Sequence, residues 1–104
     1  MITATYLPEQ LRLHVEGHAG FAEAGKDLVC AAASSLFNTA AQALAMEDAK
    51  HTVVLTNEGG DALTYYFGRK RKKAESILNT IAVGYGVLEK QYPDNVRLEV
   101  IGND

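Results

Sequence analysis

The chain has 104 residues, of which 47% are hydrophobic and 22% are charged, and its formal net charge is −3. This composition excludes a disordered chain, and the charge gives no global electrostatic basis for binding nucleic acid or a membrane. The length predicts a single domain over residues 1–104. One cysteine cannot form an internal disulfide, and we find neither a signal-peptide pattern nor 18 consecutive apolar residues, so we expect a cytoplasmic protein.

The first half of the chain predicts two strands and a helix. Apolar and polar residues alternate over Ile2–Tyr6 and again from Leu11 to Gly17, with a turn at Pro8-Glu9 between these strands. A glycine-containing loop follows, and a helix is expected over Leu28–Met46. Its apolar residues recur at helical spacing: Val29, Ala33, Leu36, Phe37, Ala40 and Leu44.

The second half predicts a hairpin, a helix and a last strand. The strands Thr52–Thr56 and Ala62–Phe67 flank the turn sequence Asn57–Asp61. A helix over Arg71–Gln91 ends before Pro93, and Val96–Val100 alternates as a strand.

The order β-β-α-β-β-α-β predicts an α+β fold, a two-layer sandwich in which two helices cover one face of a mostly antiparallel sheet. The other face would be mostly polar and exposed to water. We expect it to carry Thr3, Thr5, Arg12, His14, Glu16, Thr64, Tyr66, Arg97 and Glu99.

Cys30 falls in the first turn of the first predicted helix, with Asp27 as the expected N-cap. The amides and dipole at a helix N-terminus stabilise a thiolate and could also donate to an oxyanion. His18 lies twelve residues earlier, and Ser34 lies one turn after Cys30 on the same helix face. This arrangement is typical of a Cys-His nucleophilic site, in which the imidazole activates the thiol.

The loop between these residues contains Gly17, Gly20 and Gly25, which permit unusual backbone angles and movement. We expect residues 19–26 to form a mobile lid that packs Phe21 over the site when substrate binds.

Each candidate also has a plain structural interpretation. Cys30 could be a small buried hydrophobic residue, Asp27 a simple helix cap and Ser34 an inert helix residue. His14 is expected on a solvated strand face and His51 in a loop. Neither pairs with His18 at a metal-binding spacing, so we expect no metal site, and nothing in the sequence implies a cofactor.

The segments Gly17-His18-Ala19 and Gly25-x-Asp27-x-Val29-Cys30-Ala31-Ala32, followed by Ser34, resemble the signature of the ribosomal-processing cysteine protease (Prp) family. The resemblance implies an endopeptidase with a His-Cys dyad. Its substrate would be the precursor of large-subunit ribosomal protein number twenty-seven, from which it would remove an N-terminal extension. His18 would be the general base and Cys30 the nucleophile, with Asp27 and Ser34 in supporting positions. The family also favours a homodimer.

A basic run departs from this resemblance and lies where the second helix is expected to begin. It consists of Arg69, Lys70, Arg71, Lys72 and Lys73. Cations are unfavourable at a helix N-terminus, which points to a partner such as an acidic surface or the phosphates of ribosomal RNA. Two alternatives to the protease therefore remain open: a non-enzymatic module that binds the ribosome or RNA through this run, and a structural dimerisation domain.

Overall fold

The computed structural model describes residues 1–18, 20 and 27–102. Its elements are β1 (Ile2–Leu7), the 3-10 turn η1 (Pro8–Gln10), β2 (Arg12–Gly17), α1 (Leu28–Asp48), the 3-10 turn η2 (Ala49–His51), β3 (Thr52–Thr56), β4 (Ala62–Tyr66), α2 (Arg71–Gln91) and β5 (Val96–Val100). The predicted order of strands and helices is confirmed. The first helix continues two residues beyond the predicted end, and His51 lies in η2 rather than in an irregular loop.

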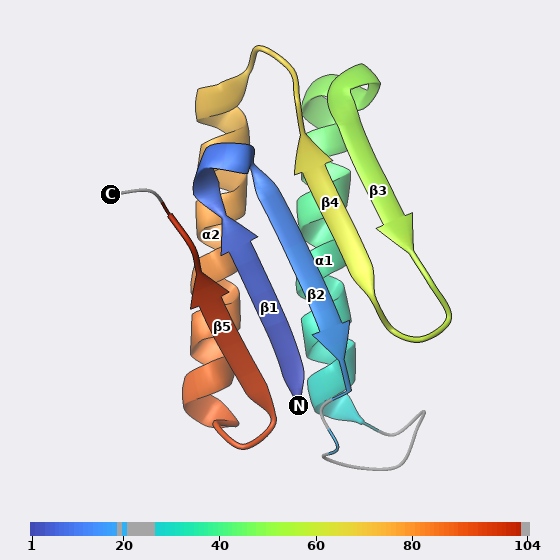
Figure 1. The fold of residues 1–104 in the computed structure, drawn as a ribbon, viewed down its shortest axis with the longest axis vertical. Coiled ribbons are helices and arrows are strands. Elements are labelled where there is room, and N and C mark those ends of the chain that lie inside the picture. The colour runs from blue at the N-terminus through green and yellow to red at the C-terminus, as the bar shows by residue number, and fades with distance from the viewer. Residues whose placement is uncertain (19, 21–26, 103–104) are drawn as a thin grey trace.

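The five strands form one sheet in the order β3-β4-β2-β1-β5. All neighbouring pairs are antiparallel except β1 and β5, which are parallel. Both helices lie against the same face, as Figure 1 shows, so the α+β two-layer sandwich is confirmed.

The core lies between the helices and the sheet. The apolar face predicted for α1 is buried apart from Leu36, which is half-buried and packs toward α2. A Cβ placed at Gly84 would lie 2.7 Å from Leu36 Cδ2, so the glycine lets the two helices approach closely there. The buried Tyr85 hydroxyl of α2 donates to the Ala33 carbonyl of α1 at 2.7 Å. This bond joins α2 to α1 at Ala33, three residues after Cys30.

The prediction for β4 was wrong about which face two of its side chains occupy. Thr64 and Tyr66 are 0% and 2% exposed and face the helices. Pairing with β2 explains this, because Thr64 lies opposite the buried Leu13 in the register. The Thr64 hydroxyl donates to the Val53 carbonyl at 2.9 Å, which satisfies the buried polar group.

The open face of the sheet is consequently less polar than predicted at the β3–β4 end. Successive side chains of a strand point to opposite faces of the sheet. The side chains of β3, of β4 and of the residue after β4 that lie on the open face are Val53, Leu55, Leu63, Tyr65 and Phe67. Leu55 and Phe67 are 58% and 57% exposed. We call these five residues the apolar edge patch.

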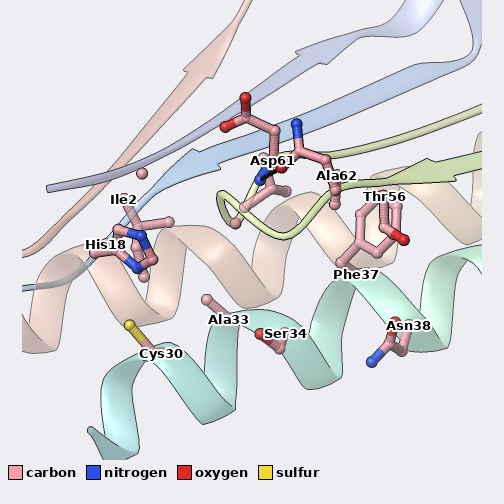
Figure 2. Close-up of a pocket in the computed structure, with 14 residues that line it drawn as sticks. Ile2, His18, Cys30, Ala33, Ser34, Phe37, Asn38, Thr56, Asp61 and Ala62 are labelled. Atoms are coloured by element: carbon pink, nitrogen blue, oxygen red, sulfur yellow. Dashed lines mark hydrogen bonds between the residues drawn. The ribbon is translucent and has the colours of Figure 1, made fainter. Parts of the chain in front are cut away.

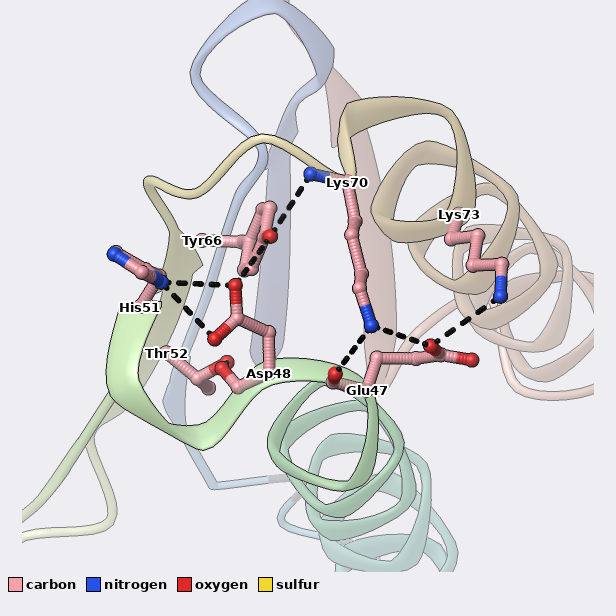
Figure 3. A network of polar contacts seen from close by, with 7 residues as sticks. All are labelled: Glu47, Asp48, His51, Thr52, Tyr66, Lys70 and Lys73. Atoms are coloured by element: carbon pink, nitrogen blue, oxygen red, sulfur yellow. Dashed lines mark hydrogen bonds and ion pairs between the residues drawn. The ribbon is translucent and has the colours of Figure 1, made fainter.

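A polar network joins the end of α1 to β4 and the start of α2 (Figure 3). The Asp48 carboxylate accepts from the Tyr66 hydroxyl at 2.7 Å and lies 2.8 Å from His51 Nδ1. The backbone N–H of Lys70 donates to the Tyr66 oxygen at 3.0 Å. Gly68 lets the chain pass this cluster, because a Cβ there would lie 2.2 Å from the Tyr66 hydroxyl oxygen. These bonds therefore connect the C-terminal end of α1, the helix that carries Cys30, to β4 and to the start of α2.

Replacing Asp48 by asparagine should lower the melting temperature at neutral pH. The hydrogen bonds from His51 and Tyr66 hold the pKa of the Asp48 carboxyl below its usual value. A group with a lowered pKa stabilises the fold above its unfolded-state pKa, and this contribution disappears as the pH falls through the folded-state pKa. The difference between variant and parent should thus shrink when the medium is acidified below about pH 4.

Thermal unfolding of Asp48→Asn at neutral and acidic pH measures this, with Glu47→Gln as the matched control. Glu47 makes only partly exposed ion pairs, at 3.7 Å to Lys70 and 3.6 Å to Lys73, besides accepting a bond at its backbone carbonyl. A loss in Asp48→Asn that is equal at both pH values, or no larger than that of Glu47→Gln, would contradict the assignment.

The segment Leu28–His51, which comprises α1 and η2, is long and apolar enough to cross a membrane by length and composition alone, with a mean hydropathy of 1.3. Its buried residues instead recur at helical spacing and join the core of the sandwich. This is the burial pattern of a core helix in a folded domain.

Candidate active site

A pocket of about 260 Å³ opens at the end of the sheet where β2 stops and α1 begins. Figure 2 shows it between the N-terminal half of α1 and the turn that joins β3 to β4. Its lining residues come from β1, β2, α1 and the β3–β4 hairpin: Ile2, Val15, Gly17, His18, Cys30, Ala33, Ser34, Phe37, Asn38, Thr56, Asn57, Gly60, Asp61 and Ala62.

Cys30 is partly buried in the first turn of α1 and faces this pocket. Asp27 is the N-cap of the helix, as predicted, and its Oδ1 accepts from the backbone N–H groups of Val29 and Cys30, both at 3.0 Å. The positive end of the macrodipole of the 21-residue helix lies beside the thiol, and the Asp27 carboxylate that caps the helix brings negative charge to the same turn.

The amides of Val29, Cys30 and Ala31 already have acceptors within the fold, so the predicted donation to an oxyanion, which stays a prediction, would require Val29 or Cys30 to release the Asp27 side chain. Val29 and Cys30 donate to the Asp27 side chain, and Ala31 donates to the Asp27 carbonyl at 3.1 Å. A cap aspartate competes directly with any substrate oxygen for these donors, which sequence spacing alone does not reveal.

His18 follows the last residue of β2, and its side chain is exposed at the mouth of the pocket. In Figure 2 its imidazole lies at the same end of the pocket as the sulfur of Cys30. The backbone before it is held tightly: Gly17 has a φ of +89°, and a Cβ there would lie 2.2 Å from the Met1 carbonyl oxygen. The Met1 ammonium in turn donates to the His18 carbonyl.

The structure thus brings together four of the residues singled out from the sequence: Gly17, His18, Cys30 and Ser34. Asp27 lies just outside the pocket lining and acts as the helix cap. Gly20 is exposed with a φ of +66° and does not line the pocket. The rest of the predicted lid, including Phe21 and Gly25, lies outside the described residues.

Sequence reasoning missed the β3–β4 turn as a wall of the site. Asn57, Gly60 and Asp61 line the pocket although they were recognised only as turn residues. They reach the pocket because β4 pairs with β2 up to the pair Val15 and Ala62, so the turn lies next to the end of β2. Figure 2 shows the Asp61 carboxylate directed away from α1.

The basic run lies at the opposite end of α1 from Cys30. From Cys30 to Asp48 the helix spans about 27 Å at 1.5 Å per residue. Lys70 and Lys73 form ion pairs with Glu47, and Arg71 donates to the Glu9 carbonyl at 2.8 Å. Three of the five cations therefore make contacts within the fold.

A partly buried cysteine at a capped helix N-terminus, with an imidazole on the same pocket, is the arrangement of a cysteine hydrolase. Residues 1–97 match the model of a protein family described as cysteine protease Prp. The chain therefore belongs to the Prp family of cysteine proteases.

Sequence relatives carry the same description. The chain is 29% identical to the ribosomal processing cysteine protease Prp of Bacillus subtilis over 93 residues, covering 85% of this chain and 83% of the relative. It is also 29% identical to Prp of Staphylococcus aureus over 85 residues, covering 81% and 80% of the two chains.

Solved structures agree in fold. The crystal structure of S. aureus Prp with a covalently linked product peptide superposes with a TM-score of 0.85 at 25% identity, covering 97% of this chain and all of that one. S. aureus Prp with a substrate peptide gives 0.79 at 24% identity, with the same coverage. SMU.848 from Streptococcus mutans gives 0.80 at 23% identity, covering 99% and 96% of the two chains, and supports the fold alone.

Proposed function

We propose that this cysteine protease uses a dyad of His18 and Cys30 to remove the N-terminal extension of large-subunit ribosomal protein number twenty-seven. The observation that carries the dyad is the shared pocket: the only cysteine of the chain and the histidine twelve residues earlier both line it. The family, whose relatives are named for ribosomal processing, supports the substrate class.

The chemistry proceeds in two stages. In the first, the Cys30 sulfur attacks the carbonyl carbon of the scissile bond while His18 accepts the thiol proton. His18 then gives this proton to the leaving amine, the C–N bond breaks and an acyl thioester forms on Cys30. In the second stage His18 takes a proton from water, the hydroxide attacks the thioester, and the C–S bond breaks to release the new C-terminus. His18 returns the proton to the sulfur of Cys30, which restores the dyad.

The supporting residues have distinct tasks in this proposal. Asp27 holds the first turn of α1 in shape through two amides and so fixes the direction of the Cys30 side chain. Ser34 lines the pocket one turn further along α1 and presents a hydroxyl to the bound peptide. The apolar floor of the pocket, which includes Val15, Ala33 and Phe37, provides room for a substrate side chain.

The experiment is cleavage of the precursor ribosomal protein, followed by mass measurement of the products. We expect a single cut that releases the extension. The matched control is the same precursor with the residues around the junction in scrambled order, and it should stay intact. An authentic precursor that survives stoichiometric enzyme, or a scrambled one cut equally fast, would contradict the proposed substrate.

The alternative of a ribosome or RNA contact concerns Arg69 and Lys72. Both are exposed, and neither forms an ion pair with another residue in the part of the chain that the structure describes. They could face phosphate groups without breaking the contacts that Lys70, Arg71 and Lys73 make inside the fold.

Neutralising the basic run should separate peptide cleavage from ribosome or RNA binding. Because the run lies at the far end of α1, replacing all five cations by glutamine should change kcat/KM for a precursor peptide by less than about tenfold, or about 1.4 kcal/mol in the barrier. Replacing Arg69 and Lys72 alone should weaken ribosome binding and flatten its salt dependence if the alternative holds. A loss of cleavage beyond about a hundredfold, with Cys30 still reactive, would instead place the run in the substrate site.

We further propose that the protein is a homodimer joined through the apolar edge patch. The patch presents the strongly exposed Leu55 and Phe67 beside the unpaired edge of β3, a feature that folded proteins usually cover. Sedimentation velocity should show a dimer that Leu55→Lys dissociates, whereas an unchanged dimer in this variant would exclude the patch as the interface.

A further inference from the structure

We propose that Gly60, in the turn between β3 and β4, is a positioning residue that holds the imidazole of His18 in its working orientation. This inference rests on the proposed role of His18 as the base. It assigns the orientation of the His18 ring to the β3–β4 turn, which is distant from His18 in the sequence.

The contact follows from the sheet register. Val15 of β2 pairs with Ala62 of β4, and both chains continue past this pair at the same end of the sheet. Gly17 and Gly60 each lie two residues beyond it, and His18 comes next in the chain. A Cβ built on Gly60 would lie 3.1 Å from His18 Cε1 and 3.4 Å from Nε2.

These two atoms form the outer edge of the imidazole, farthest from the backbone of His18. The part of the ring that carries Nε2 therefore occupies the space that a side chain on Gly60 would need, and the Gly60 backbone faces it across that space. At 3.1 Å, a methyl group on Gly60 would push the ring away by a few tenths of an ångström. The φ of +94° at this position also favours glycine, so its backbone conformation and its close approach to the ring both disfavour a side chain.

The turn that presents Gly60 is held by its own hydrogen bonds. Asn57 donates its N–H to the Asp61 carbonyl at 3.0 Å, and Gly60 donates to the Asn57 carbonyl at 3.3 Å. The Asp61 N–H donates to the Asn57 side chain at 3.1 Å. These hydrogen bonds fix the conformation of the turn, and with it the position of Gly60 beside the imidazole.

His18 needs such a support because its side chain is exposed at the end of a strand. An exposed side chain samples several staggered rotamers, and only some of them direct the ring toward Cys30. A misplacement of about 1 Å in a catalytic group can cost about a hundredfold in rate. The Gly60 backbone bounds the space available to the ring on one side, and this restriction raises the fraction of time in which the base is in place.

Gly60→Ala tests the inference when it is combined with His18→Ala in a double-mutant cycle. Two readouts are used: kcat/KM for the precursor peptide, and the rate of Cys30 alkylation by iodoacetamide at about pH 6. Gly60→Ala alone should lower kcat/KM by about tenfold or more and slow alkylation toward the rate of His18→Ala. In the His18→Ala background, the same change at position 60 should have no further effect on either rate.

Gly59→Ala is the matched control, because its methyl group would meet the Asn57 side chain at 3.3 Å instead of His18. It should keep kcat/KM within about threefold of the parent. Melting temperatures of all variants separate loss of fold from loss of position.

The inference is overturned if Gly60→Ala leaves both rates unchanged, or if it lowers them by the same factor with and without His18, because the effect would then be general strain in the turn. Failure of the dyad itself has a different signature, since His18→Ala alone would then retain full activity.

Discussion

Replacing Cys30 by alanine should abolish cleavage of the precursor, with a loss of at least about a thousandfold, or about 4 kcal/mol in the barrier. In the proposed mechanism the sulfur forms the covalent intermediate, and no other cysteine in the chain can replace it. The fold should survive, because Cys30 is only partly buried and alanine is well tolerated in a helix. Retained cleavage in Cys30→Ala, measured on the precursor peptide, would contradict the enzyme mechanism.

Cys30→Ser provides the companion variant. It keeps the shape of the side chain but replaces the thiol by a hydroxyl, which is a much weaker nucleophile. We expect it to be inactive as well, and to bind the precursor peptide with unchanged affinity. An inactive variant that has also lost peptide binding would indicate that the substitution damaged the pocket.

Replacing His18 by alanine should lower kcat/KM by about a hundredfold or more, the usual range for removal of a general acid–base group. Alkylation of Cys30 at about pH 6 should slow in the same variant, because the variant lacks the imidazole that we propose takes the thiol proton. Both effects are measured on the same preparation by peptide cleavage and by iodoacetamide labelling.

His14→Ala is the matched control for this prediction. His14 also belongs to β2, but its side chain lies on the open face of the sheet, away from the pocket that contains Cys30. It should keep both rates close to those of the parent. A His18→Ala variant that behaves like His14→Ala would remove His18 from the mechanism.

The sequence predicted the fold well where its patterns are unambiguous. In β2 the apolar Leu13 and Val15 alternate strictly with polar residues, so the buried face was evident. In β4 both alternating sets contain an apolar or aromatic residue, and periodicity could not choose between them. The choice depends on pairing with β2, which places Thr64 opposite Leu13, and on the bond from Tyr66 to Asp48, 18 residues away.

The same distinction holds for the candidate site. The sequence indicated His18, Cys30 and the Asp27 cap because they lie close together in the chain. An N-cap residue, a first-turn cysteine and a nearby histidine can be recognised without knowledge of the tertiary structure. The wall formed by Gly60 and Asp61 could not be found in this way, because it depends on the pairing of two strands that are almost fifty residues apart. The ion pairs of Lys70 and Lys73 with Glu47 likewise depend on the packing of α2 against α1.

The central claim, that Cys30 carries the reaction, is tested most directly by comparing alkylation with activity. Because the chain contains a single cysteine, intact mass spectrometry reports the fraction of Cys30 that iodoacetamide has modified. We predict that residual cleavage of the precursor falls in direct proportion to this fraction and reaches zero when every molecule is modified. A fully alkylated protein that still cleaves the precursor would contradict the claim.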